Sequence, residues 1–162
     1  AMGDCLAVAA LNLKKFNKKK FKLFHPHGSL GNQLKTAEDL MISKDGIPFI
    51  NENSSMKKAL DIITRKKLGV LIVRDSKKNT TGIITDGQIR RSNLKKGNLR
   101  DLKVKNVMTK NPISIDKDVL AAKSLAIMSD KKITSLCVHK NRSRNKTIGI
   151  LHIHHILNAN IQ

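Results

Sequence analysis

Aromatic side chains are scarce in this sequence of 162 residues, which has four Phe, no Trp and no Tyr. Proteins that bind single-stranded nucleic acid stack bases on aromatic rings, so a stacking platform is nearly excluded. The formal net charge of +20 attracts anions, but the Lys and Arg residues are dispersed along the chain. No zinc-finger or RNA-recognition signature accompanies them. We therefore expect a solvated basic surface and no specific nucleic-acid partner.

Cysteine and long apolar runs are scarce as well. Cys5 and Cys137 form no CxxC pair, which is typical of a reducing compartment and not of a disulfide scaffold. No apolar run approaches the roughly 20 residues that span a bilayer. The apolar first ten residues lack the charged flank and cleavage pattern of a signal peptide. These absences predict a cytoplasmic protein with no membrane partner.

An internal duplication is the main positive feature of the sequence. Four short blocks occur twice in the same order, at separations of about 64 to 67 residues. The blocks begin at Asp39, Ile47, Lys67 and Gly82 in the first copy, and at Asn106, Asn111, Lys132 and Gly149 in the second. Their common order and spacing indicate two repeats of one structural unit.

Each repeat is predicted to be a β-α-β-β-α unit, which makes the fold class α/β (α+β). Ser54 or Ser55 can cap the first helix of copy one, and Asp116 or Asp118 that of copy two. Two strands and a final helix follow at 68–73, 82–85 and 87–94, and again at 134–138, 148–151 and 153–158. One such unit buries too little surface to be stable alone. We expect the two to pack sheet against sheet, with a ligand cleft between them.

The repeats resemble CBS domains, which occur in pairs and bind adenosyl or other nucleotide ligands. The leaders at 39–41 and 106–109, the Pro-containing strands and the ending at 82–85 carry this resemblance. The preceding 3–9 segment and the loop at 25–31, His-Pro-His-Gly-Ser-Leu-Gly, are similar to the end of a sugar isomerase (SIS) domain in the D-arabinose 5-phosphate isomerase family. The expected domains are an SIS tail and linker at 1–38, with a helical remnant at 4–13, a first CBS domain at 39–100 and a second at 101–162.

The resemblance implies a parent enzyme that interconverts D-arabinose 5-phosphate and D-ribulose 5-phosphate, in synthesis of the lipopolysaccharide sugar Kdo. It also implies that His25 is a catalytic residue, because a neutral imidazole can move protons near pH 7. The chain contains no phosphate-binding Ser/Thr loop or acidic base of an SIS core, so we expect the regulatory half of a longer enzyme. A dimer of this chain, a tetramer of the full-length enzyme and no cofactor are expected.

The predicted ligand-binding residues lie at the end of each repeat. Nucleotide-binding CBS units often end in Gly-h-x-Thr-x-x-Asp, whose Thr suits a phosphate and whose Asp accepts from a ribose. The first copy has Thr85, Asp86 and Gln88 here, and the second has His152 and His155. The ribose carboxylate is thus missing from both. AMP or ATP, the nucleotide sugar CMP-Kdo, and a purely structural pair without a ligand all remain open.

Two further interpretations concern the same residues. Asp86 is expected to cap a helix that begins near Gly87. His152 and His155 share a helix face at a zinc-compatible spacing, but no Cys or carboxylate near them completes a ligand shell, so no metal is expected. The alternative to a regulatory part of an isomerase is a freestanding sensor of adenosyl nucleotides. The loop that contains His25 favours the isomerase.

The expected absence of an SIS core gives a direct prediction. The purified chain should not convert D-arabinose 5-phosphate to D-ribulose 5-phosphate, because one histidine cannot replace the base and the phosphate cradle that the reaction needs. A coupled assay for D-ribulose 5-phosphate, with a full-length member of the family as positive control, measures this. Robust turnover by the chain alone would contradict the prediction.

Overall fold

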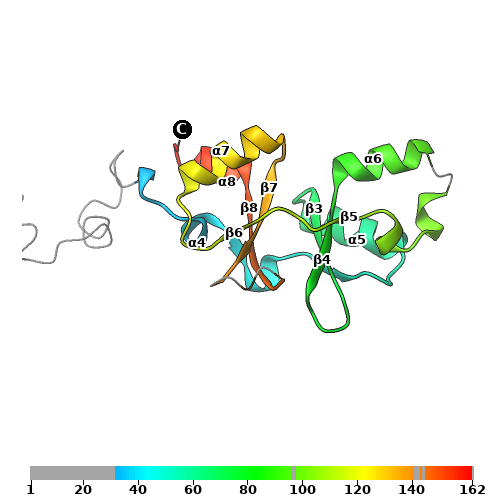
Figure 1. Cartoon of the computed structure of the whole chain (residues 1–162). Helices are drawn as coiled ribbons and strands as arrows, with labels where there is room; N and C mark the ends of the chain where they lie inside the picture. Colours follow the sequence, from blue (N-terminus) through cyan, green and yellow to red (C-terminus); the bar gives the residue numbers. More distant parts are fainter. Residues whose placement is uncertain (1–31, 96–97, 141–142, 144, 162) are drawn as a thin grey trace, which may run out of the picture.

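The computed structural model describes residues 32–95, 98–140, 143 and 145–161 (Figure 1). The helix expected at 4–13 and the loop with His25 lie outside these residues. The first repeat contains α4 (Ala37–Leu40), β1 (Ile42–Ser43), β2 (Phe49–Asn51), α5 (Met56–Lys66), β3 (Val70–Arg74), β4 (Thr80–Thr85) and α6 (Asp86–Lys95). The second contains β5 (Thr109–Lys110), β6 (Ser114–Asp116), α7 (Ala121–Lys131), β7 (Ser135–His139), β8 (Thr147–His152) and α8 (Ile153–Asn158). The predicted repeat of strand, helix, two strands and helix is confirmed.

The helices α5 and α7, which occupy equivalent positions in the two repeats, begin in different ways. Ser55 caps α5 as predicted, since its hydroxyl accepts a hydrogen bond from the backbone N–H of Lys58 at 3.4 Å. The predicted Asp116 or Asp118 cap of α7 is wrong, because α7 begins only after Leu120. The Ala121 N–H instead donates to the carbonyl of Lys35 at 2.8 Å. A backbone segment from far away in the sequence thus replaces the side-chain cap of α7.

Two four-stranded sheets form the centre of the molecule, with strand orders β1-β8-β7-β6 and β2-β3-β4-β5. In each sheet one short strand comes from the other repeat. β1 of the first repeat pairs antiparallel with β8, and β5 of the second pairs antiparallel with β4. The repeats therefore exchange their leading strands. The first strand of each repeat in the sequence belongs in space to the sheet of the other repeat.

Short 3₁₀ helices flank the exchanged strands. Lys44–Gly46 follows β1, while Leu99–Asp101 and Val104–Asn106 precede β5. The segments that precede β1 and β5 each dock on the other repeat through matching backbone hydrogen bonds. Ala37 N–H donates to the carbonyl of Val119 at 2.8 Å, and Val104 N–H donates to that of Ser54 at 2.9 Å. These pairs are related by the internal duplication, so the two repeats follow an approximate twofold axis. Near this axis, the hydroxyls of Thr80 and Thr147 are 2.7 Å apart.

Three apolar clusters fill the interior. One packs α5 against the β2–β5 sheet, and a second packs α7 and α8 against the other sheet. The third lies between the sheets and contains Ile47, Val70, Ile72, Cys137 and Ile150. The Cys137 thiol is free, and burial raises its pKa to about 11. It therefore behaves as a small apolar side chain of the core.

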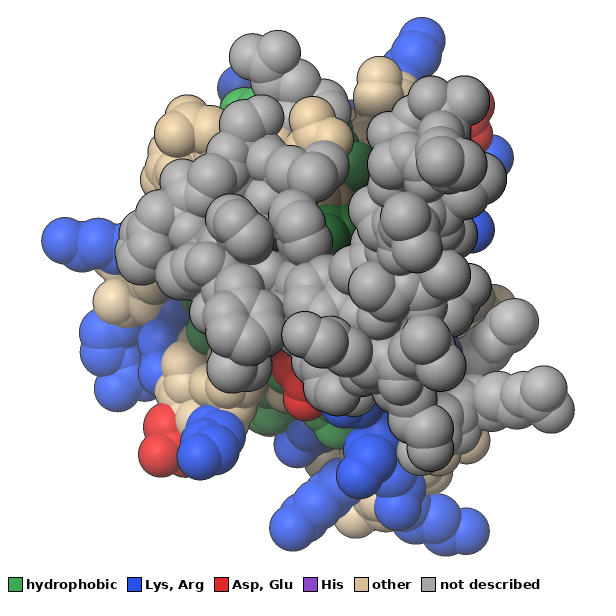
Figure 2. All heavy atoms as spheres, turned by 90° about the vertical axis from the view of Figure 1, so that its left-hand side faces the viewer, with side chains coloured by type: hydrophobic (Ala, Val, Ile, Leu, Met, Phe, Trp, Pro, Cys, Tyr) green, Lys and Arg blue, Asp and Glu red, His purple; other side chains and the backbone are tan. Residues whose placement is uncertain are grey.

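Basic side chains lie mainly at the surface, as expected from the dispersed charge. Exposed Lys residues occupy both ends of α5, at Lys57, Lys58 and Lys66, and the end of α7, at Lys131. Figure 2 shows Lys and Arg around much of the edge of the visible face, with few acidic side chains among them. None of the helices in the described part of the chain has the length and apolar character needed to span a bilayer.

The exchanged leaders approach the sheets so closely that glycine is required at the contact. A Cβ atom on Gly82 would lie 2.9 Å from both Met108 Cγ and the carbonyl oxygen of Thr109. Because this oxygen belongs to the β5 backbone, it cannot move aside without disturbing the exchanged strand. At Gly149, a Cβ atom would meet the side chain of Met41 and the carbonyl oxygen of Ile42 in the same manner.

Gly82→Ala is therefore expected to lower the free energy of unfolding by about 1 to 3 kcal/mol, the usual cost of overpacking. Urea unfolding followed by circular dichroism measures the change. Gly87→Ala is the matched control, because the nearest atom to its Cβ would be the flexible end of Arg91 at 3.4 Å. That control should be neutral or stabilising. Unchanged stability of Gly82→Ala would refute the close approach.

Candidate ligand-binding cleft

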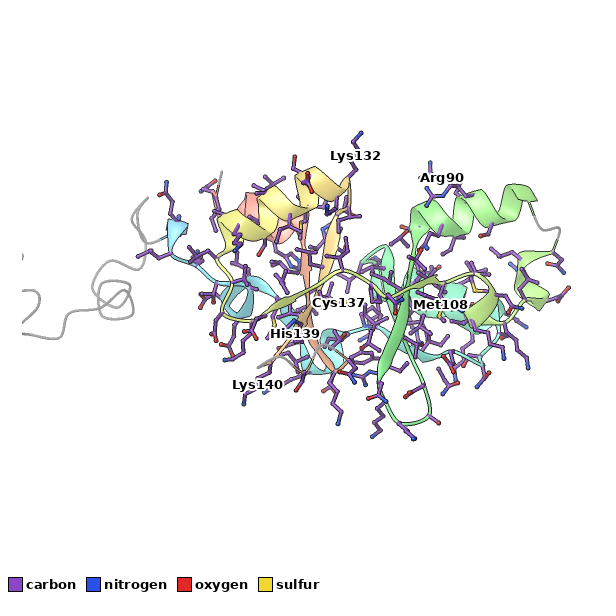
Figure 3. All side chains as sticks on the ribbon, in the orientation of Figure 1. Arg90, Met108, Lys132, Cys137, His139 and Lys140 are labelled. Carbon is purple, nitrogen blue, oxygen red and sulfur yellow. The ribbon has the colours of Figure 1, made fainter. Side chains whose placement is uncertain are left out.

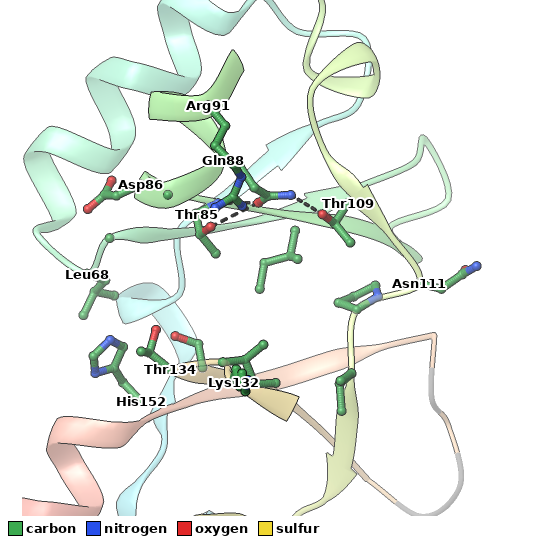
Figure 4. Close-up of a pocket in the computed structure, with 17 residues that line it drawn as sticks. Leu68, Thr85, Asp86, Gln88, Arg91, Thr109, Asn111, Lys132, Thr134 and His152 are labelled. Atoms are coloured by element: carbon green, nitrogen blue, oxygen red, sulfur yellow. Dashed lines mark hydrogen bonds between the residues drawn. The ribbon is translucent and has the colours of Figure 1, made fainter. Parts of the chain in front are cut away.

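A cleft of about 520 Å³ lies between the two repeats (Figure 4). One wall is formed by Leu68 and Gly69, just before β3, and by the junction of β4 with α6. The opposite wall is formed by the connection from α7 to β7 and by His152. The connection from β5 to β6 passes along the side. The cleft is thus built by both repeats, as the sequence predicted for a ligand site.

Thr85 and Gln88 form a hydrogen-bonded unit on the α6 wall. The Oε1 atom of Gln88 accepts from the backbone N–H of Thr85 at 2.8 Å and from its hydroxyl at 3.2 Å. The Nε2 atom of Gln88 donates to the hydroxyl of Thr109, on the exchanged strand β5. Gln88 therefore holds the beginning of α6 and ties it to the other repeat. Its amide is already engaged at the position where a ribose would bind.

Asp86 does not have the capping role predicted for it. The helix α6 begins at Asp86 itself, and the side chain that reaches back to the preceding N–H is that of Gln88. The Asp86 N–H donates to the carbonyl of Gly69 at 3.0 Å. Gly69 has a φ of +63°, and a Cβ atom there would lie 2.8 Å from Asp86 Oδ2. A glycine at 69 thus allows the Asp86 carboxylate to lie at the cleft wall.

Two cations face the cleft from opposite walls. Arg91 comes from α6 and lies beside Gln88, while Lys132 follows α7 on the other side (Figure 4). Among the described residues that line the cleft, Asp86 is the one carboxylate. The amino-terminal end of α6 adds a partial positive charge. With the hydroxyls of Thr85 and Thr134, these groups suit an anionic ligand.

His152 is the residue at which β8 passes into α8. Its Nδ1 atom accepts a hydrogen bond from the backbone N–H of His154 at 3.2 Å, which leaves Nε2 as the protonated nitrogen of the neutral ring. Burial, and then the neighbouring His154 and His155, lower the pKa of His152 below its usual 6.5. At neutral pH the ring therefore contributes a polar, uncharged surface to the cleft.

His155 is the predicted site residue that the structure does not place in this cleft. It is half-buried in α8, and its Nδ1 atom is buried without a hydrogen-bond partner among the described residues. The other four predicted residues, Thr85, Asp86, Gln88 and His152, all line the cleft. The described part of the chain contains no group of three or more His, Cys, Asp or Glu residues arranged to hold a metal ion.

The structure adds residues that sequence reasoning missed. Arg91 follows Gln88 by three positions, so helical spacing alone would have placed it near the same wall. Lys132 lies just after a helix, and that position gave no signal for a ligand contact. Thr109 reaches Gln88 because β5 crosses to the other repeat, an exchange that the sequence did not reveal.

Comparison with known proteins identifies the class. The sequence model of the CBS domain matches residues 37–95 and 104–161, so the chain belongs to the CBS domain family. Solved structures agree with this fold: the CBS-domain containing protein ATU1752 from Agrobacterium tumefaciens has a TM-score of 0.71 at 20% identity, covering 80% of this chain and 96% of that one. CBSX2, solved in complex with AMP, has a TM-score of 0.65 at 21% identity, covering 77% and 95%.

Among curated proteins the chain is similar to arabinose 5-phosphate isomerase KdsD. The Salmonella typhi protein is 37% identical over 161 residues, which cover 99% of this chain and 48% of the relative. The protein of Escherichia coli strain K12 is 36% identical over the same length and coverage. The chain thus spans about half the length of the curated relatives it matches. The resemblance drawn from the repeats and the preceding loop is confirmed.

The lowered pKa of His152 can be measured by a pH titration followed by NMR. We expect the ring to titrate below pH 6.5, and His154→Gln to raise that pKa by removing one neighbouring charge. Because folding favours the neutral ring, its stabilising contribution is present above pH 6.5 and is lost as pH falls through the folded pKa. A titration of His152 at or above 6.5 would contradict the burial of this ring.

Proposed function

We propose that this chain is the regulatory CBS pair of an enzyme that interconverts D-arabinose 5-phosphate and D-ribulose 5-phosphate for Kdo and lipopolysaccharide synthesis. The similarity to the isomerases extends over 161 residues, whereas the CBS domains begin only at residue 37. The additional similarity therefore includes the segment with His25, which a freestanding sensor does not need. His25 stays the predicted catalytic residue of the parent enzyme, in an active site completed by its isomerase domain.

The observation that carries the regulatory proposal is the cleft between the repeats. Two cations and several hydroxyls in it are suited to hold an anion, with Asp86 the one carboxylate among the described lining residues, and its walls belong to different repeats. A ligand that contacts both walls stabilises their mutual packing by its own binding energy. This is the property that a sensing module requires, because only a ligand with different affinity for two states can shift their populations.

The charges and hydrogen bonds of the cleft narrow the choice of ligand. Solved relatives hold AMP in CBSX2, and 5'-methylthioadenosine and S-adenosyl-L-methionine in MJ0100. A ribose at Gln88 would have to break the contacts of this amide with Thr85 and Thr109. A ligand with two separate anionic groups instead engages Arg91 and Lys132 together. CMP-Kdo also carries a ribose, which would have to lie away from Gln88 like that of AMP or ATP, so the ribose does not separate these ligands. Its phosphodiester and its carboxylate are separate anionic groups, whereas the charges of AMP and ATP lie in one phosphate chain. On this ground we place CMP-Kdo ahead of AMP and ATP, as an end product that regulates the parent enzyme.

Calorimetry with CMP-Kdo, AMP and ATP tests this proposal. The double variant R91Q/K132Q should bind CMP-Kdo at least about tenfold more weakly, since each cation contributes a charge-assisted contact. The matched control is R90Q/K131Q, which removes the same charge from neighbouring positions that do not line the cleft. Figure 3 shows Arg90 pointing away from the body of the molecule at α6. The control should keep its affinity within about twofold.

Each outcome separates the alternatives. Heat with AMP or ATP alone would favour an adenylate sensor, and absence of heat with all three would leave a structural pair that assembles the enzyme. Equal loss of affinity in both double variants would show a general charge effect and overturn the cleft assignment. Light scattering measures the predicted dimer of this chain and tetramer of the full-length enzyme independently of any ligand.

A further inference from the structure

A second pocket, of about 480 Å³, lies beside β2 in the first repeat. β2 is the outer strand of its sheet, where it pairs with β3 among the described strands. The pocket is bounded by the Lys44–Phe49 segment, by the last turns of α5 and by Arg74 at the end of β3. We call it the β2-edge pocket. Its described lining residues do not overlap with those of the cleft between the repeats.

The β2-edge pocket concentrates positive charge. Four cationic side chains line it: Lys44, Arg65, Lys66 and Arg74. Asp45 is the one carboxylate among its described lining residues. The Lys66 ammonium donates to the backbone carbonyl of Asp45, a residue far away in sequence. This bond holds the end of α5 against the loop before β2. The cationic side chains of α5 and of the Lys44–Phe49 segment are therefore held close together around the pocket.

Arg74 gives the pocket a preorganised guanidinium. Its Cζ atom lies 3.0 Å from the ring centroid of Phe49, and its Nη2 atom donates to the carbonyl of Thr147 at 3.3 Å. The Arg74 Nε atom is buried and has no hydrogen-bond partner among the described residues. A buried donor without an acceptor is costly. The aromatic ring and the Thr147 carbonyl thus hold a guanidinium that retains one unused buried donor.

The remaining lining residues are apolar. Ile47 and Pro48 are buried, while Phe49 and Ile62 are half-buried, so the pocket offers a hydrophobic floor below its cations. Pockets with convergent polar groups on an apolar lining are typical of small-molecule sites. The internal duplication relates part of this lining to the cleft, because Ile47–Phe49 is the counterpart of Asn111–Ile113. The cationic part has no such relation, since Arg65, Lys66 and Arg74 correspond to Asp130, Lys131 and His139, which do not line the cleft.

We infer that the β2-edge pocket is a second anion-binding site, which takes the phosphate of a small phosphorylated metabolite. The guanidinium of Arg65 and the ammonium groups of Lys44 and Lys66 supply charge-assisted donors to phosphate oxygens. The apolar floor contacts the uncharged part of the metabolite. The site belongs to the first repeat and acts separately from the cleft between the repeats.

Pyrophosphate titration of the isotope-labelled chain, followed by NMR, tests the inference with a defined probe. Saturable shifts are expected at the backbone amides of Lys44, Ile47 and Phe49. In R65Q/K66Q the dissociation constant for pyrophosphate should increase at least about tenfold. The control K57Q/K58Q removes the same charge from the exposed first turn of α5, outside the pocket, and should change it less than about twofold.

The single variant Arg65→Gln retains the contact of Lys66 with Asp45, so it tests the charge without loosening the loop. It should weaken pyrophosphate binding by about threefold or more, with the circular dichroism spectrum unchanged. Equal weakening in K57Q/K58Q, or shifts confined to residues of the cleft, would overturn the β2-edge site. CMP-Kdo binding in the cleft should be unaffected by R65Q/K66Q, so failure of one site does not imply failure of the other.

Discussion

The close approach of each leading strand to the sheet of the other repeat is the constraint on which the rest of the structure depends. Gly82 and Gly149 leave only enough space for Met108 and Met41, and a side chain at either glycine would meet the leader backbone. The exchanged strands form hydrogen bonds with the outer edges of β4 and β8. The segment before β1 also provides the Lys35 carbonyl that accepts from the first N–H of α7. Neither repeat can form its complete sheet without the other, which explains why the duplicated unit functions as a pair.

The cleft is a consequence of this exchange. Because β5 crosses over, Thr109 reaches Gln88 and the β5–β6 connection runs along the side of the cleft. The opposite wall comes from the second repeat, so Lys132 faces the α6 wall where Arg91 lies. The pseudo-equivalent positions are not chemically equivalent, since Thr85 corresponds to His152 and Gln88 to His155. The duplication therefore produces a symmetric frame with an asymmetric binding surface.

The sequence predicted the parts of the fold that depend on local signals. The Ser55 cap, the α8 span at 153–158 and the repeat of β-α-β-β-α elements follow from spacing and capping chemistry. The Asp116 or Asp118 cap failed because a tertiary contact from Lys35 replaced it. Thr109 and Lys132 were missed for the same kind of reason, since their place in the cleft depends on which strand crosses to which sheet. Local patterns do not contain that information.

The two pockets differ in what their occupation can do to the molecule. A ligand in the cleft contacts both repeats, so its binding energy is linked to their mutual packing. The segment at 37–41 also docks on the second repeat, through Ala37, Leu40 and Met41, and so adds to that packing. The β2-edge pocket is built by the first repeat, and Arg74 links it to the second repeat through the Thr147 carbonyl. The β2-edge pocket is therefore connected to the second repeat by one side-chain contact, whereas the cleft is bounded by both repeats.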